Sequence, residues 1–302
     1  MPEMHPLQES DSQAVERLWN SAAPFDRLNA QLLHEKVWGD ADFRPELAVV
    51  SRDQQQLLGI GVAVCRPRED RITGFVKLLA VAPESQRAGI GSSIYRQLET
   101  RCHELGALEM RVAESAPNYL QPGVDERCEA ALGFFAKQGY SAVGQATNMT
   151  VDLKQWESSY RSDTFGGEHP EGYNVQRATP ALEAAIHQFV TRHWPPWWTE
   201  VSNALANDPV SLFVTVDAGR VIGFAAHDAN NRGTGWFGPM GTCPDQQGRG
   251  IGRRLLAHCL DDMRQQGYVS ATIPWVAPVE FYRKHCGAEV DRTFVRLSKQ
   301  LT

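Results

Sequence analysis

The sequence lacks the features that mark several special classes of protein. No apolar run approaches the length of a transmembrane helix, and the first residues lack the basic start and apolar stretch of a signal peptide, so we expect a cytosolic protein outside the membrane. No block of basic residues occurs, and the formal net charge is −6, which argues against nucleic-acid binding. The six cysteines include no Cys-x-x-Cys pair, so we expect free thiols, no metal site and no disulfide framework.

The composition is that of an ordinary globular protein, with 42% hydrophobic and 22% charged residues. A chain of 302 residues is long enough for two domains of common size, each with its own core. An internal duplication is therefore plausible on length alone, and a repeated motif would indicate it.

One motif occurs twice in the chain. Residues 86–91 read Gln-Arg-Ala-Gly-Ile-Gly, and residues 247–252 read Gln-Gly-Arg-Gly-Ile-Gly. Each copy follows a short β-like run and precedes an amphipathic helical pattern. The register extends back to Pro83 and Pro244, which are 161 positions apart and are each followed by an acidic residue. Repeats of this length indicate duplicated domains and not the units of a solenoid.

The chemistry of this loop is anion binding. Two glycines let the backbone approach a ligand closely, and the N-terminus of the following helix adds a partial positive charge, so a phosphate or pyrophosphate is the expected guest. A P-loop requires Gly-Lys-Ser/Thr, but Ser92 and Arg253 follow the last glycine of the two copies. A dinucleotide fingerprint requires a third glycine, but Ile94 and Leu255 occupy that position.

The remaining pattern, Gln-x-x-Gly-x-Gly after a strand and a proline turn, resembles the acetyl-CoA site of the Gcn5-related N-acetyltransferase (GNAT) superfamily. Residues 131–140 and 279–288 resemble the late helix of that family with its Phe-Tyr signature. Upstream, residues 47–50 with 57–61, and 212–216 with 221–225, each predict a β-hairpin. The resemblance implies an α/β fold with mixed sheets, in which two GNAT-like acyl-CoA N-acyltransferase domains lie in tandem.

The resemblance and the local composition together predict the domain boundaries. The first domain is expected over residues 1–153, ending in a strand-like run at 149–153. A polar segment over 154–172, with Ser-Ser, Gly-Gly and a proline, predicts a linker. The second domain is expected over 173–302.

The resemblance also implies which residues bind acetyl-CoA. In the family, main-chain N–H groups of a splayed strand contact the cofactor, and these positions are Leu79, Val81, Met240 and Thr242 in this sequence. The loops complete the implied site with Gln86, Arg87, Ala88, Gly89, Ile90 and Gly91 in the first copy, and with Gln247, Gly248, Arg249, Gly250, Ile251 and Gly252 in the second.

The Phe-Tyr signature implies a general acid. Tyr282 matches the family tyrosine that protonates the departing thiolate, and a phenol with an ordinary pKa of about 10 is protonated at neutral pH. The alternative is a core aromatic whose hydroxyl is satisfied locally. The first copy has Phe135 at this position, so it lacks that acid.

The general base is less evident. In the second copy, the strand around Trp236 contains no ionisable residue, and the candidates His227 and Glu280 are both expected at the surface. Lys77 lies in the corresponding strand of the first copy, but a cationic lysine is a poor base unless it is desolvated. Water is the remaining possibility.

Aromatic residues gather in the second copy, and they are candidates for an acceptor wall or for core packing: Trp194, Trp197, Trp198, Trp236 and Trp275. The first copy has 45 positions between Gly89 and Phe134, whereas 31 separate Gly250 from Phe281. The extra 14 residues around 114–125 predict a segment that shapes a substrate cleft or covers the other domain.

The sequence thus indicates an acetyltransferase that moves an acetyl group from acetyl-CoA to a primary amine of a small molecule or peptide, with the second domain as the catalytic one. The first domain is then a second active site or a cofactor-binding relic. Two alternatives stay open: a non-catalytic regulatory or scaffold protein that binds CoA thioesters, and a transferase of a longer acyl group. Neither the acceptor nor the oligomeric state follows from the sequence.

Overall fold

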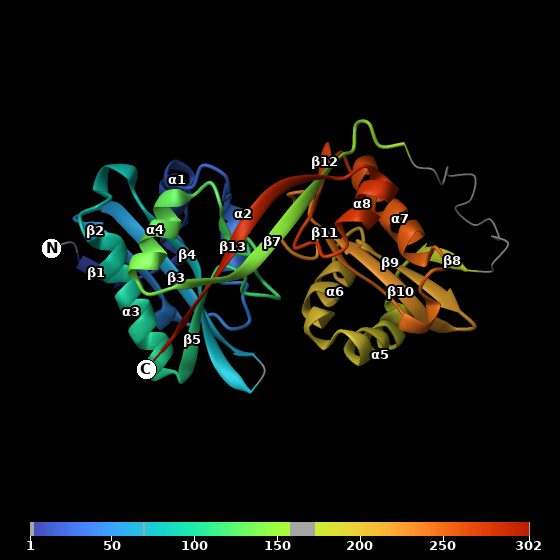
Figure 1. The fold of residues 1–302 in the computed structure, drawn as a ribbon, viewed down its shortest axis with the longest axis horizontal. Coiled ribbons are helices and arrows are strands. Elements are labelled where there is room, and N and C mark those ends of the chain that lie inside the picture. The colour runs from blue at the N-terminus through green and yellow to red at the C-terminus, as the bar shows by residue number, and fades with distance from the viewer. Residues whose placement is uncertain (1–2, 69, 158–172, 302) are drawn as a thin grey trace. The chain divides into compact units, whose positions relative to one another are not determined.

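The computed structural model describes residues 3–68, 70–157 and 173–301. The chain forms two compact units, which we describe separately (Figure 1). The first unit comprises Met1–Ala146 together with Phe294–Thr302, and the second comprises Thr147–Thr293. Two strands, β7 (Ser141–Asp152) and β13 (Glu289–Gln300), each begin in one unit and end in the other.

These units differ from the expected domains at both ends. The first unit stops before residue 153, and it contains the last nine residues of the chain, which the sequence pattern assigned to the second domain. Alternating apolar residues identify a strand but do not say which sheet it joins. Most of the expected linker lies outside the described residues, but its start packs in the second unit, where Trp156 Nε1 donates to Asp261 Oδ1 at 2.8 Å.

The first unit contains one mixed sheet with helices on both faces. Its strands run in the order β1 (Glu3–Pro6), β2 (Ala48–Asp53), β3 (Gln56–Arg68), β4 (Arg71–Val81), β5 (Ala107–Val112) and the end of β13. β4 and β5 are parallel, and the other neighbours are antiparallel. In Figure 1 the red end of β13 runs beside β5, where Ser298 pairs with Arg111. The short β6 (Val124–Asp125) also pairs with β13.

Helices cover the two faces of this sheet. α1 (Ser12–Ala22) and α2 (Ala30–Lys36) pack on one face, and α1 buries Val15, Leu18 and Trp19, whose spacing of three and four residues places them on one side of the helix. α3 (Ile90–Glu104) and α4 (Glu129–Lys137) form the second core with Val76 and Met110. Each face of the sheet therefore has its own hydrophobic core.

The second unit repeats this arrangement. Its antiparallel sheet has the order β11 (Phe237–Thr242), β10 (Arg220–His227), β9 (Leu212–Asp217) and β8 (Asn174–Arg177). β12 (Ser270–Ile273) pairs with the second half of β7. α5 (Glu183–His193) and α6 (Trp198–Leu205) share one core, and α7 (Ile251–Gln265) and α8 (Val279–Cys286) share another.

The expected hairpins and helices are confirmed. β2 pairs with β3 and β9 with β10, both antiparallel. Phe134 and Phe135 lie on α4, and Phe281 and Tyr282 lie on α8. Short 3-10 helices connect the elements at Glu9–Asp11, Pro45–Leu47, Pro83–Ser85, Pro180–Leu182, Pro195–Trp197 and Pro244–Gln246. The class is the expected mixed α/β fold.

Candidate active site

The two glycine loops have nearly the same backbone conformation. Gln86 and Gln247 both have φ −65°, with ψ of 157° and 156° respectively. Gly89 (φ 84°) and Gly250 (φ 75°) then cap the following helices in the left-handed region, which glycine adopts at no steric cost. No atom lies within 4 Å of the position that a Cβ would take at either glycine. The backbone conformation, and not crowding by the protein, therefore requires glycine at these positions.

Each loop opens a helix of 15 residues, and the first N–H groups of that helix have no partner within it. The first intrahelical bonds that reach the caps are from Ser93 N–H to Gly89 O at 3.0 Å and from Arg254 N–H to Gly250 O at 3.2 Å. The preceding N–H groups of the loop and first turn are exposed in an array that suits phosphate oxygens. Both units therefore have the loop backbone on which the sequence-based prediction of anion binding rests, and the binding itself stays a prediction.

In the first unit, the strand before the loop separates from its neighbour. Pairing of β4 with β5 ends at Val76 and Val112, although β4 continues to Val81. A bulge places one extra residue, Lys77, in β4 opposite β3. Ala82 N–H donates to Leu58 O on β3 at 2.9 Å. Because successive N–H groups alternate in direction, those of Leu79 and Val81 point away from β3, into the gap beside β4.

The second unit has the same feature at β11. Ala225 of β10 pairs with Met240 of β11, and the next pair is His227 with Phe237. Two steps along β10 therefore match three steps along β11, so β11 also contains one extra residue. Within the described residues, one parallel bridge, from Trp236 to Thr272, connects β11 to β12. Cys243 N–H donates to Ile222 O at 2.8 Å, so the N–H groups of Met240 and Thr242 point away from β10.

A phenylalanine from the late helix closes the side of each gap. A Cβ at Gly91 would lie 3.6 Å from the Phe134 ring, and a Cβ at Gly252 would lie 3.7 Å from the Phe281 ring. The last glycine of each motif therefore lies within contact distance of the late helix.

Tyr282 lies in the second unit beside the bulge of β11. Its ring is 6.2 Å from that of Phe237, and 8% of the residue is exposed. The carbonyl of Tyr282 accepts from Cys286 Sγ at 3.1 Å and from the Ala288 N–H at 3.4 Å, whereas its hydroxyl makes no hydrogen bond to the described residues. Burial raises the pKa of Tyr282 well above its usual value of 10, so the phenol stays protonated at neutral pH. The Tyr282 ring is buried, but its hydroxyl oxygen is not among the fully buried polar atoms that lack a partner in the described residues, so the hydroxyl is accessible from outside.

Comparison with known proteins agrees with this geometry. The sequence matches the acetyltransferase (GNAT) family over residues 12–140 and again over 175–288, which together exceed half of the chain. The chain belongs to that family. The two matched regions confirm that two GNAT-like domains lie in tandem, as the duplicated motif predicted. No curated protein matches the chain.

Several solved structures share the fold across nearly the whole chain. A GCN5-related glucosamine N-acetyltransferase region of a fungal multi-domain GH3 β-N-acetylglucosaminidase has 20% identity and a TM-score of 0.82, covering 99% of this chain and 38% of that one. A GCN5-related N-acetyltransferase from Sphaerobacter thermophilus has 19% identity and a TM-score of 0.72, covering 99% and 95%. A tandem GNAT protein from the clavulanic acid biosynthesis pathway has 17% identity and a TM-score of 0.68, covering 99% and 98%.

The GNAT chain has no acid hydroxyl at the matching position of its first unit. Phe135 is buried there, with its ring 5.3 Å from that of Tyr140 and 6.3 Å from that of Tyr95. Tyr95 donates its hydroxyl hydrogen to Glu99. This tyrosine and its neighbours form an aromatic core in which the position that matches Tyr282 has no hydroxyl.

His227 is not at the surface, and that expectation was wrong. The residue has no exposed area, and its Nε2 lies 2.8 Å from Asp262 Oδ2. Burial opposes ionisation, but the hydrogen bonds to Asp228 and Asp262 raise the pKa of His227 above its usual 6.5. Arg177 also pairs with Asp262. His227 is therefore part of a closed ionic network and is not available as a base.

The other base candidate, Glu280, is at the surface as expected. Its side chain is 81% exposed and pairs with Arg283 on the same helix. Among the described residues, no group of three or more His, Cys, Asp or Glu side chains is arranged to hold a metal ion. No helix in the described ranges is long and apolar enough to cross a membrane.

A buried charge cluster fills the corresponding position of the first unit. Lys77, at the bulge of β4, pairs with Asp40, and Asp40 also pairs with Arg66. Burial lowers the pKa of Lys77 to about 7, against the opposing effect of Asp40. Arg66 Nη1 donates to the carbonyl of Ser115 at 2.7 Å, which ties the extra segment 114–125 to the cluster. The second unit has Gly238 where Lys77 stands, so it has no equivalent charge.

Sequence reasoning missed Asp40 and Arg66. A lysine in the apolar run of β4 was the available signal, because a buried lysine requires a counter-ion. Asp40 comes from the turn that follows α2, and Arg66 comes from β3, so their proximity depends on the packing of α2 against the sheet. The cluster occupies the side of β4 that faces the early helices.

The aromatic residues of the second unit separate into two groups. Trp194 and Trp197 stack at 5.4 Å between ring centroids in the connection from α5 to α6, and both are half-buried. A Cβ at Gly241 of β11 would lie 2.7 Å from the Trp194 ring, so this ring lies against the strand that precedes the loop. Trp198 instead contacts His187 on α5, with ring centroids 4.5 Å apart.

The remaining two tryptophans lie at the strand ends that flank the gap. Trp236 is buried where β11 begins. Trp275 follows β12, and its main-chain N–H donates to Asn148 Oδ1 at 3.0 Å. The described structure thus places Trp194 against β11 and Trp197 beside Phe224 of β10, and it places Trp236 and Trp275 near the ends of β11 and β12.

Proposed function

We propose that the second unit transfers an acetyl group from acetyl-CoA to a primary amine of a small molecule or peptide. The observation that carries this proposal is the unpartnered hydroxyl of Tyr282 beside the bulged end of β11, which leads into an intact glycine loop. An anion cradle by itself predicts only binding. A protonated phenol at the reactive end of that cradle supports group transfer.

The residues of the second unit fit a CoA thioester. The N–H groups from Gly248 to Gly252 suit its pyrophosphate, and Arg249 adds a cation to the same loop. The outward N–H groups of Met240 and Thr242 suit the amide groups of its pantetheine arm. When bound, acetyl-CoA supplies an activated acetyl group as a thioester.

The chain's own groups then have distinct tasks. At the β11 bulge Gly238 has a main-chain N–H and Pro239 has none, so we assign stabilisation of negative charge on the thioester oxygen to the N–H of Gly238. Tyr282 holds the proton that the thiolate takes as the C–S bond breaks and the C–N bond forms. Because His227 is enclosed and Glu280 is exposed, we assign removal of the amine proton to water.

We propose that the first unit binds acetyl-CoA without transferring its acetyl group. Its cradle has the same conformation, but Phe135 replaces the phenol. In addition, Lys77, Asp40 and Arg66 satisfy one another on the side facing the early helices, which is where an acceptor would enter. In the second unit this side is lined by the rings of Trp194 and Trp197 instead of charges.

The acceptor is proposed to contact Trp194 and Trp197. A stacked aromatic surface suits an apolar amine or the face of a sugar ring. One structural relative is described as a glucosamine N-acetyltransferase region, and an amino sugar is compatible with this surface. Amino sugars are therefore the first acceptors to test.

A test of transfer is release of free thiol from acetyl-CoA in the presence of a panel of amines that includes glucosamine, polyamines and short peptides. We expect amine-dependent release by the parent chain and loss of it in Gly250→Glu.

The alternative of a non-catalytic regulatory or scaffold protein is favoured by the lack of an ionisable residue at the β11 bulge. It predicts tight binding of acetyl-CoA with no thiol release above background for any amine.

The same assay with longer acyl-CoA donors tests the acyl chain length. At Gly238 no atom lies within 4 Å of the position that a Cβ would take, so the bulge leaves room beside the thioester. If a longer donor reacts faster than acetyl-CoA, the donor assignment is wrong, but the transferase assignment stands.

Replacement of Trp194 by alanine is expected to raise the KM for the amine about tenfold and to change the KM for acetyl-CoA much less, because the lost stacking serves only the acceptor. Steady-state kinetics with both substrates varied measures this split. Trp198→Ala is the matched control, since Trp198 packs on α5. A large loss of stability in Trp194→Ala with both constants unchanged would show that the ring is a packing residue.

A further inference from the structure

Two cysteines of the first unit lie in the same hydrophobic core, between its sheet and α3. Cys65 is on β3 and is half-buried, and Cys102 is in the last turn of α3 and has no exposed area. Cys102 is a buried member of this core, and Cys65 packs against it. Both are free thiols in this structure, and neither has a task in the proposed transfer.

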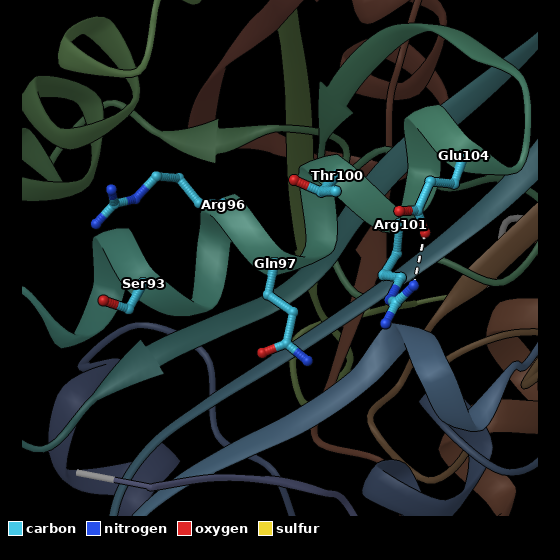
Figure 2. Close-up of a pocket in the computed structure, with 6 residues that line it drawn as sticks. All are labelled: Ser93, Arg96, Gln97, Thr100, Arg101 and Glu104. Atoms are coloured by element: carbon cyan, nitrogen blue, oxygen red, sulfur yellow. Dashed lines mark hydrogen bonds and ion pairs between the residues drawn. The ribbon is translucent and has the colours of Figure 1, made fainter. Parts of the chain in front are cut away.

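Cys102 belongs to the inner face of α3. Ile94, Leu98 and Cys102 are spaced by four residues, so they share one side of the helix, and none of them is exposed. The outer face is polar and contains a hollow of about 470 Å³, which is lined by Ser93, Arg96, Gln97, Thr100, Arg101 and Glu104. Figure 2 shows these side chains along one helix, with Arg101 bonded to Glu104 at 2.7 Å. Because α3 alone lines this hollow, the contacts that join the helix to other elements lie on its inner face.

Gly74 of β4 brings the two sulfur atoms together. Cys65 lies directly opposite Gly74 in the pairing of β3 with β4, and the Cβ positions of such a pair are about 5 Å apart on the same face of the sheet. A Cβ at Gly74 would lie 3.0 Å from the Cβ of Cys102 and 3.1 Å from its Sγ. The missing side chain of Gly74 therefore leaves the space that Cys102 fills, and this space adjoins the Cys65 side chain.

The two thiols differ in reactivity. A hydrogen bond from the Cys102 thiol lowers the pKa of Cys65, burial opposes this effect, and the charge of Arg44 adds to it. The same hydrogen bond and then burial raise the pKa of Cys102. Because the thiolate is the reactive form of cysteine, the more exposed Cys65 is the sulfur that an oxidant reaches first, and Cys102 is placed to attack it afterwards.

We infer that Cys65 and Cys102 are a redox modification site, at which hydrogen peroxide converts the two thiols to a reversible disulfide. In the first step the Cys65 thiolate attacks a peroxide oxygen, so that an S–O bond forms, the O–O bond breaks and Cys65 becomes a sulfenic acid. In the second step the Cys102 sulfur attacks the Cys65 sulfur, the S–S bond forms, and the departing hydroxide takes the Cys102 proton to give water. The two thiols lose two electrons, and one peroxide is reduced to two waters.

The disulfide would hold α3 on the sheet. This helix begins at Gly89, the cap of the first glycine loop, so the cross-link restrains the helix that carries that loop. It also closes a long loop of chain, which restricts the unfolded state and opposes opening of this region. With the glycine loops aligned, Met263 takes the place of Cys102, so the second unit does not have this pair.

The test uses the reduced full chain, hydrogen peroxide as the oxidant, and mass spectrometry without a reducing agent. The intact mass is expected to fall by two hydrogen atoms, and a digest is expected to contain one pair of peptides joined through Cys65 and Cys102. Amide hydrogen exchange in α3 should slow by about tenfold or more in the oxidised chain, because the cross-link opposes local opening. Dithiothreitol should restore both the mass and the exchange rate.

Substitution of each cysteine separates the two steps. Cys102→Ala removes the second thiol, so Cys65 should stop at the sulfenic acid and react with dimedone, whereas the parent chain should be labelled much less. Cys102→Ser provides a second variant with the same expectation, in case the alanine variant does not fold. Cys65→Ser should give neither the label nor the cross-link. Cys243→Ser changes a half-buried cysteine of the second unit, and this matched control should cross-link as the parent does.

Three results would overturn the inference: an unchanged mass after peroxide treatment, oxidation of Cys65 to a sulfinic acid without a cross-linked peptide, or a cross-link between other cysteines. None of these measurements uses acetyl-CoA or an amine. Failure of the proposed transfer would therefore leave the disulfide assignment in place, and failure of the disulfide would leave the proposed transfer in place.

Discussion

Acetyl-CoA is expected to lose one of two binding events when Gly250 is replaced by Glu, and to lose the other when Gly89 is replaced by Glu. Each glycine has a left-handed φ that a glutamate adopts only with strain, and each lies where a carboxylate would repel the pyrophosphate. Calorimetry on the parent chain should show up to two sites, and each variant should retain one. The effect on the blocked site should exceed a hundredfold.

The two glycine variants control for each other because the loops have the same conformation. Circular dichroism should show that both keep the parent fold, since no protein atom lies near either substituted position. If both variants bind acetyl-CoA as the parent does, the loops are not the cofactor sites. If only Gly250→Glu has an effect, the first loop is a relic that no longer binds.

Tyr282→Phe is expected to lower turnover roughly a hundredfold or more while leaving the affinity for acetyl-CoA nearly unchanged. The substitution removes one hydroxyl that has no partner among the described residues, so the core around the ring should keep its packing. Pre-steady-state and steady-state rates with a reactive amine would measure the effect. The first unit already has phenylalanine at this position, which is why activity should follow the second unit.

A donor with a better leaving thiol provides a sharper readout than turnover alone. If Tyr282 protonates the thiolate, a thioester of lower thiol pKa should be affected much less by Tyr282→Phe than acetyl-CoA is. Near-parental turnover in both Tyr282→Phe and Gly250→Glu would place the working site in the first unit. Tyr119 of the extra segment would then be the residue to examine there.

The sequence alone was sufficient for the family, the duplication and the local form of both loops. These features depend on short-range rules: glycine at positions with a left-handed φ, an N–H array at a helix start, and apolar periodicity in the flanking elements. The equal backbone angles of the glutamines and glycines in the two loops follow from nearly identical short sequences. Tyr282 was predicted to be the acid in the same way, from its place in a short motif, and that role stays a prediction.

Tertiary structure decided what the local pattern left open. The position of His227 could not be predicted, because its burial depends on Asp262 from α7 and Asp228 from the β10–β11 turn. The cluster of Lys77, Asp40 and Arg66 likewise joins three elements that are distant in sequence. The last nine residues belong to the first unit because β13 continues beyond the second unit and pairs with β5. Strand pairing and ion pairing are long-range interactions, and so only the folded chain determines which residues satisfy them.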